Sequence, residues 1–145
     1  MELRELLTNH LLINAMVAWA VAQVLKTIIY AATNRTLEWE RLFGDGGMPS
    51  GHSATVTSLA VTAGLEYGLG SAHFALAATL AIIVMHDAMS VRLEAGKHAK
   101  ALNELLELLS SDLENEVKLK ELLGHTPMQV VVGATLGLCV ALILK

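Results

Sequence analysis

The sequence has little cysteine and few aromatic residues, and basic residues do not prevail in it. Its one cysteine, Cys139, lies inside the last apolar run of a chain of 145 residues. A single cysteine excludes an intramolecular disulfide and a cysteine-based metal site. Aromatic residues make up 4% of the chain, the formal net charge is −4, and no block is rich in Lys or Arg. Because nucleic-acid binding depends on a basic surface, nucleic acid can be set aside as a partner.

Charged residues are also scarce, at 17%, whereas hydrophobic residues reach 54%. This balance exceeds that of an ordinary soluble domain and predicts a membrane protein. Four apolar stretches have close to the roughly 20 residues that a membrane-crossing helix needs: Leu11 to Thr33, Ser53 to Leu69, Ala72 to Val91 and Met128 to Leu144. Glu66 interrupts the second stretch, and His86 and Asp87 interrupt the third. For these two stretches, a buried helix in a soluble bundle is therefore the alternative. We expect an all-α integral membrane helical bundle of about four spans, with residues 1–145 as one membrane domain.

Between the third and fourth stretches lies the polar region Arg92 to Gly124. Leucine and valine recur there at steps of three and four residues, which predicts two amphipathic helices. Ser111 and Glu114 are spaced as a capping box for the second helix, and Gly124 is a natural C-cap.

Glycines recur at a spacing of four in two of the apolar stretches, as Gly64 with Gly68 and as Gly133 with Gly137. Such pairs allow helices to approach closely in lipid, and mere tolerance of glycine is the alternative.

The distribution of basic residues predicts the topology. The loops after the first and third stretches carry most of them: Arg35, Arg41, Arg92, Lys97, Lys100, Lys118 and Lys120. Because Lys and Arg accumulate on the cytoplasmic side, we expect these loops in the cytoplasm and both termini outside.

The only two prolines stand just before the second and fourth apolar stretches, as Pro49 and Pro127. Proline is favoured at the first helical position, so both residues predict helix starts. Thr126 and Gln129 would form a capping box at the second of them. Pro49 lies in the segment GDGGMPSGHSA. At this helix start, the amides of Ser50, Gly51 and His52 would point out of the helix N-terminus, where an anion can bind.

Two histidines would emerge at the same membrane face, because His52 and His125 stand at the starts of spans on one side. Lys26, Arg92, Lys97, Lys118 and Lys120 are expected at that face too. One imidazole to attack phosphorus, a second to protonate the leaving oxygen, and cations with backbone amides are sufficient for phosphoryl transfer. No metal and no other cofactor would be required. A cap or surface role is the alternative for either histidine alone, and we read His10, His73, His86 and His98 as structural.

At these residues the chain resembles a known family. MPSGHSA is similar to the second signature of the type 2 phosphatidic acid phosphatase and vanadium-dependent haloperoxidase superfamily, and GHTPMQVVVGATLG is similar to the third. GGMPSGHSA, HDAMSVRLEAGKHAKALNELL and LKELLGHTPMQVVVGATLG together resemble a divergent branch, the small bacterial and plastid membrane proteins described as acid phosphatase/vanadium-dependent haloperoxidase related. The resemblance implies a multi-pass protein of a bacterial plasma membrane or a plastid membrane, with His125 in the place of the nucleophile and His52 in the place of the acid. It also implies a phosphate site, for which we name Lys26, Ser50, Gly51, Arg92 and Lys120.

The chain departs from the superfamily pattern at two places. Leu119 stands where the third signature usually has arginine, and Gln129 stands where it has aspartate. Lys118, Lys120 or Arg92 could replace the arginine, although lysine lacks the bidentate geometry. The first signature is only suggested by Lys26 and Arg35.

Several functions remain open. The sequence favours a membrane phosphatase that hydrolyses a lipid phosphate or pyrophosphate through a phosphohistidine intermediate. The alternative is a non-catalytic membrane protein that keeps the phosphate or headgroup pocket, which the residues at Leu119 and Gln129 favour. A haloperoxidase is a third possibility, but it would need a fuller set of cations around vanadate. A transporter and a soluble helical protein are the remaining alternatives. A homo-oligomer stays open as well.

Overall fold

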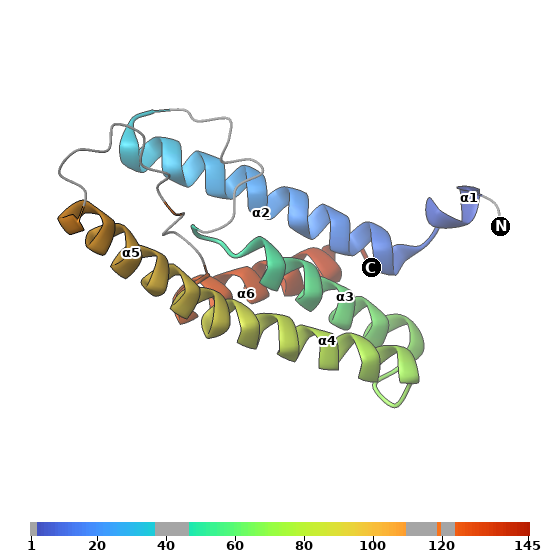
Figure 1. Cartoon of the computed structure of the whole chain (residues 1–145). Helices are drawn as coiled ribbons and strands as arrows, with labels where there is room; N and C mark the ends of the chain where they lie inside the picture. The colour runs from blue at the N-terminus through green and yellow to red at the C-terminus, as the bar shows by residue number, and fades with distance from the viewer. Residues whose placement is uncertain (1–2, 37–46, 110–118, 120–123) are drawn as a thin grey trace.

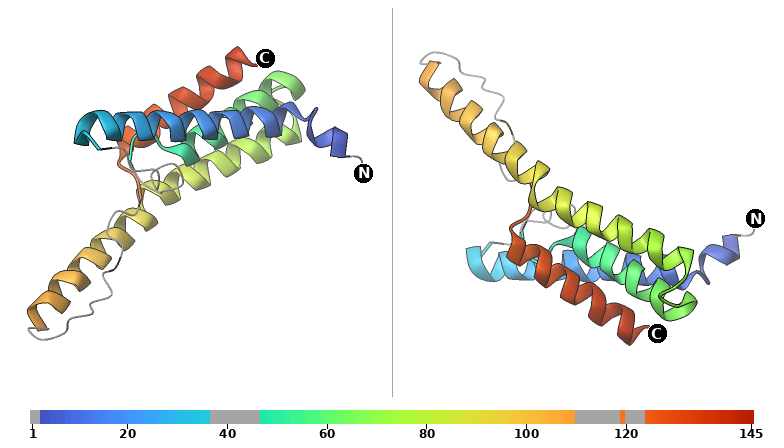
Figure 2. Two further views of the ribbon diagram at one scale, coloured as in Figure 1. Left: turned by 90° about the horizontal axis from the view of Figure 1, so that it is seen from above. Right: turned by 90° about the horizontal axis from the view of Figure 1, so that it is seen from below.

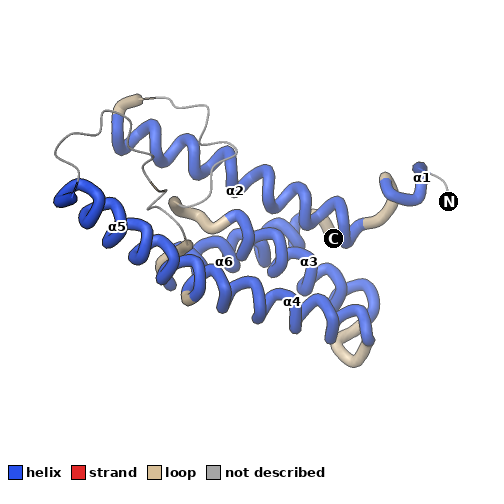
Figure 3. The backbone as a smooth tube through the Cα atoms, in the orientation of Figure 1, coloured by secondary structure: helices blue, strands red, loops and turns tan. Residues whose placement is uncertain are grey.

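The computed structural model describes residues 3–36, 47–109, 119 and 124–145. Its elements are α1 (Leu3–Leu6), α2 (His10–Asn34), α3 (Gly51–Tyr67), α4 (Ala72–Met89), α5 (Val91–Leu109) and α6 (Pro127–Ile143). All of these elements are helices, and the described residues contain no strand (Figure 3). The expected all-α class is confirmed, and each of the four apolar stretches is a helix within a few residues of its predicted bounds.

Helix α3 lies at the centre of the bundle, because α2, α4 and α6 all pack against it (Figure 1). Helices α2, α3 and α6 meet through small side chains: Ala18, Ala22 and Ala54 are buried there, with Val140 beside them. Helices α3 and α4 meet through Val56, Ala60, Ala63, Ala77 and Ala81. Larger apolar residues point outward instead, among them Leu76, which is 73% exposed, and Ile82, which is 67% exposed. Small residues inside and large apolar residues outside are what a helical bundle in lipid requires.

Two stretches of the described chain are long and apolar enough to cross a membrane. They are α2 and Ala72–Leu106, which combines α4 with most of α5, whereas α6 is apolar but shorter. Helix α5 continues from α4 after Ser90 and projects beyond the other helices (Figure 2). The two chain ends lie at the same end of the bundle (Figure 1).

The helix starts follow local capping. Thr126 is the N-cap of α6, its side chain accepts from Gln129 N–H, and Pro127 is the first helical residue, as the sequence predicts. The expectation for Pro49 is wrong by two residues, because Ser50 is the N-cap of α3 and the helix begins at Gly51. A cap residue has non-helical backbone angles, so the proline ahead of it lies outside the helix.

The two glycine pairs have different roles. A Cβ at Gly133 would collide with the Ser50 carbonyl oxygen, and one at Gly137 would collide with that of Ala54, so this pair is the contact surface of α6 on α3. Gly64 instead faces the side chains of Leu69 and Phe74, and Gly68 is the C-cap of α3 at a positive φ of 82°. The expected close approach of helix backbones therefore holds for Gly133 with Gly137, whereas Gly64 packs tightly against side chains only.

The first predicted amphipathic helix corresponds to α5. The second, with its capping box at Ser111 and Glu114, lies outside the described residues. Gly124, the predicted C-cap, has a positive φ of 80°, and a Cβ there would collide with the backbone of Arg92 and Leu93.

Candidate functional site

The structure brings His52 and His125 together. His52 is in the first turn of α3, and His125 stands immediately before Thr126, the N-cap of α6. Their ring centroids are 6.2 Å apart and the ring planes are inclined by 57°. His125 is only 3% exposed, whereas His52 is half-buried. Two imidazoles, one deep and one nearer the surface, therefore share one end of the bundle.

Contacts to two other helices fix His125. Its backbone N–H donates to the carbonyl oxygen of Ala88 at the end of α4, at 2.9 Å. Its Nδ1 lies 3.3 Å from Oε1 of Gln129, and that oxygen also accepts from Thr126 N–H at 3.0 Å. Because Oε1 can only accept, Nδ1 is the donor in this contact and carries the ring proton. The capping box of α6 thus sets the tautomer of its neighbouring histidine.

The N-termini of α3 and α6 lie side by side because Gly133 allows the Ser50 backbone to approach. Ser50 N–H donates to the Gln129 carbonyl oxygen at 3.1 Å, which ties the two helix starts together. The expectation that this amide points out toward an anion is therefore wrong. The Ser50 side chain is also fully buried, and it accepts from Ser53 N–H and from the Ser53 hydroxyl. Of the predicted amides, those of Gly51 and His52 remain at the end of α3, where a helix leaves its first N–H groups without helical acceptors.

Lys26 lies at the same level of the bundle. Helices α2 and α3 run antiparallel, with His10 bonded to Glu66 and Asn14 bonded to Thr62. Each step of four along α2 is thus matched by a step of four back along α3, and the same register puts Lys26 level with Ser50. Lys26 is only 6% exposed. A cation is therefore buried beside the start of α3.

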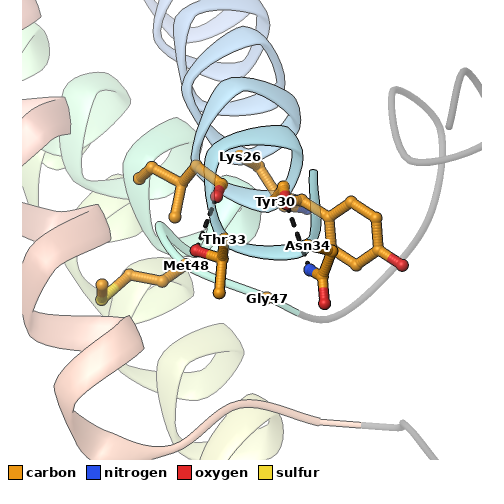
Figure 4. A pocket seen from close by; sticks show the side chains of 7 residues that line it. Lys26, Tyr30, Thr33, Asn34, Gly47 and Met48 are labelled. Atoms are coloured by element: carbon orange, nitrogen blue, oxygen red, sulfur yellow. Dashed lines mark hydrogen bonds between the residues drawn. The ribbon is translucent and has the colours of Figure 1, made fainter. Parts of the chain in front are cut away.

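A cavity of about 190 Å³ opens beside Lys26 (Figure 4). Gly47 and Met48 form one wall. The other wall is formed by side chains from the last turns of α2: Lys26, Ile29, Tyr30, Thr33 and Asn34. Gly47 has a positive φ of 84°, and a Cβ there would lie 3.4 Å from Cγ of Lys26. Glycine at this position therefore lets the segment before α3 cover the Lys26 stem.

The other predicted cations are placed differently. Nε of Arg92 donates to Oδ2 of Asp87 at 2.7 Å, and both side chains are substantially exposed. The Arg92 backbone lies against Gly124, next to His125, so the residue is near the site while its side chain is paired. Lys120 and Lys118 lie outside the described residues.

Three of the remaining histidines contact side chains other than those of His52 and His125. His10 pairs with Glu66 at 2.8 Å, His73 stacks on Tyr67 with ring centroids 4.2 Å apart, and His86 Nδ1 lies 3.3 Å from the Ser90 hydroxyl. Among the described residues, no three potential metal-ligating side chains form a group.

Sequence reasoning missed Gln23. Gln23 is 7% exposed and lies one turn before Lys26 on α2. Its side-chain oxygen would lie 3.7 Å from a Cβ placed on Gly51, at the start of α3. The spacing of three residues from Lys26 puts both on one helix face, and that was the available signal.

Comparisons with known proteins agree with the membrane architecture. A family described as "Divergent PAP2 family" matches residues 7–140. The uncharacterized membrane protein YuiD of Bacillus subtilis (strain 168) is 40% identical over 152 residues, which covers 97% of this chain and 96% of that protein. No solved structure matches the chain.

Proposed function

The chain belongs to the divergent PAP2 family of membrane proteins, and from that premise we propose that it hydrolyses a lipid phosphate or pyrophosphate through a phosphohistidine intermediate. The observation that carries the proposal is the approach of His52 and His125, whose ring centroids are 6.2 Å apart at the paired starts of α3 and α6.

In the first step, Nε2 of His125 attacks phosphorus and the bond from phosphorus to the ester oxygen breaks. His52 gives its proton to that oxygen, which leaves as an alcohol, or as a phosphate if the substrate is a pyrophosphate. In the second step, His52 takes a proton from water, the water oxygen attacks the phosphohistidine, and inorganic phosphate leaves. The Gly51 amide and Lys26 would stabilise the charge on the phosphoryl oxygens.

The ring separation sets a requirement for binding. A nucleophile lies about 3 to 3.5 Å from its target atom before attack, and the acid must reach the leaving oxygen on the opposite side of phosphorus. Rings 6.2 Å apart are closer than that in-line arrangement needs. The half-buried His52 would therefore move outward when a phosphate enters, while the buried His125 stays in place.

A non-catalytic phosphate or headgroup pocket is the second candidate. Gln129 accepts the Nδ1 proton of His125 but contributes no charge to stabilise an imidazolium. Arg92, which could stand in for the missing arginine, is paired with Asp87. Both observations favour binding without turnover.

Phosphate release from a panel of lipid mono- and diphosphates, by the purified protein in detergent, separates the two functions. The His125→Ala variant, prepared identically, measures any contaminating phosphatase. The enzyme proposal expects release that orthovanadate inhibits and that the variant lacks. If the protein binds inorganic phosphate but releases none from any lipid, the pocket is a binding site and the hydrolase proposal is wrong.

We also propose a multi-pass arrangement in which α2, α3, α4 and α6 cross the membrane of a bacterium or a plastid, with the site on the cytoplasmic side. The chain ends at one end of the bundle support it, since an even number of crossings returns the chain to the starting side (Figure 1). Arg35→Cys and Lys100→Cys, each in a Cys139→Ser background, should react with a membrane-impermeant thiol reagent only after the cells are opened. Labelling of intact cells at either position would reverse the topology.

A further inference from the structure

The side-chain oxygen of Gln23 is a buried polar atom without a hydrogen-bond partner in the described part of the chain. The residue is 7% exposed. A buried amide oxygen that accepts no hydrogen bond lowers the stability of the fold. Packing alone would favour leucine or methionine here, so the amide needs another explanation.

The position of Gln23 supplies that explanation. A Cβ on Gly51 would lie 3.7 Å from Oε1 and 4.0 Å from the amide carbon of Gln23, so the polar end of the side chain faces the first residue of α3. The first-turn amides of α3 and the buried Lys26 are the positively polarised or charged groups on this side of the bundle. The amide therefore lies at the innermost end of the candidate phosphate site, one helical turn deeper than Lys26.

We propose that Gln23 is a phosphate-binding residue, a role that rests on the phosphate site of the proposed function. A carboxamide can present its NH2 group by rotation about its last bond, and NH2 then donates to a phosphoryl oxygen. This donor lies on α2, whereas the Gly51 amide lies on α3. The anion is thereby held from two helices, and its depth is limited by a neutral group that neither titrates nor exchanges protons with the histidines.

The test uses inorganic phosphate as the probe and compares two buried polar groups that both lack partners. Gln23→Leu removes the proposed donor, and Ser58→Ala removes a fully buried hydroxyl without a partner, eight residues along α3 from Ser50. Both substitutions remove an unsatisfied polar group, so both should leave the thermal midpoint unchanged or raise it. Phosphate binding to each full-length protein in detergent is then measured by isothermal titration calorimetry.

We expect Gln23→Leu to raise the Kd for phosphate about 10-fold or more, as for the loss of one hydrogen bond to a charged group, with Ser58→Ala unchanged. Equal affinities of Gln23→Leu and the wild type would overturn the role of Gln23 and leave the site itself standing. An equal loss in both variants would also overturn it, because the effect would not be local. If the wild type binds no phosphate, the proposed function fails and this inference fails with it. If Gln23→Leu does not fold, Gln23→Met, which preserves the side-chain length, is measured in its place, and the same increase in the Kd for phosphate is expected.

Discussion

The two ends of α3 each hold a pair of histidines, yet they differ in construction. At the Glu66 end, His10 pairs with Glu66 and His73 stacks on Tyr67, and the His10 side chain is 65% exposed. At the Ser50 end, His52 faces His125, and His125 is 3% exposed. At the Glu66 end, residues of α2, α3 and α4 make contacts at the surface. At the Ser50 end, α3 and α6 pack together and Lys26 of α2 is buried.

This difference teaches that histidine by itself marks neither end as a site. In water, an exposed pair such as His10 with Glu66 adds little stability and forms no enclosed space. At the Ser50 end, the helix N-termini and the buried cation concentrate positive potential around an imidazole whose tautomer is fixed. Convergence and burial separate a candidate anion site from a surface contact.

The largest expected effect on stability comes from comparing a glycine at each end. Gly133→Ala places a methyl group against the Ser50 carbonyl oxygen, whereas Gly70→Ala meets no atom within 4 Å. Overpacking should outweigh the roughly 1 kcal/mol that alanine gains in a helix, for a net loss of about 2 kcal/mol. Thermal unfolding in detergent should show a lower midpoint for Gly133→Ala alone, with weaker phosphate binding. Equal midpoints would mean that α6 does not depend on this close approach.

The largest expected effect on activity comes from replacing one histidine at each end. His52→Ala removes the proposed acid and should lower phosphate release about 10²- to 10⁴-fold. His73→Ala removes only the ring stacked on Tyr67 and should leave release unchanged. Initial rates on one lipid phosphate measure both. Comparable losses in the two variants would show that the ends do not differ in function.

A third substitution gives His125 a carboxylate partner, as His10 already has. His10 has the carboxylate of Glu66 as its partner, whereas His125 has the neutral amide of Gln129. Gln129→Glu preserves the side-chain length and the capping box, and its charge would stabilise an imidazolium. We expect turnover to rise about tenfold, equivalent to about 1.4 kcal/mol in the barrier. A turnover that stays at zero in both proteins would favour the non-catalytic pocket.

The smallest effect lies at the exposed end. Glu66→Gln removes the charge that faces His10, but the two side chains are 31% and 65% exposed. Solvent screens such a pair, so the free energy of unfolding should change by less than about 1 kcal/mol. Phosphate binding should not change at all. A large loss of affinity would connect the two ends and break the distinction between them.

Local features were predictable from the sequence, whereas most tertiary contacts were not. The apolar stretches and the capping box of Thr126 with Gln129 depend on neighbours within a few residues, and the structure has both. Gly64 with Gly68 and Gly133 with Gly137 have identical spacing, so only the packing of α6 on α3 distinguishes them. The partner of the Ser50 amide is not predictable from local sequence, because its acceptor on Gln129 lies 79 residues further along the chain.

Gln23 went unnoticed for the same reason. A single glutamine in an apolar run has no local signal beyond its spacing from Lys26, and the significance of its amide depends on the start of α3 beside it. The approach of His52 to His125 could be inferred, because both precede or begin spans that start on one side. Whether the pair acts on phosphate stays a prediction.

Imidazole NMR on protein labelled with ¹⁵N at its six histidines tests the central claim most directly. Inorganic phosphate is titrated into the detergent-solubilised protein, with His52→Ala and His125→Ala used to assign the two resonances. The account predicts saturable shifts for His52 and His125, and none for His10 or His73. Shifts at His10 or His73 in place of those two, or no shift at any histidine at saturating phosphate, would contradict it.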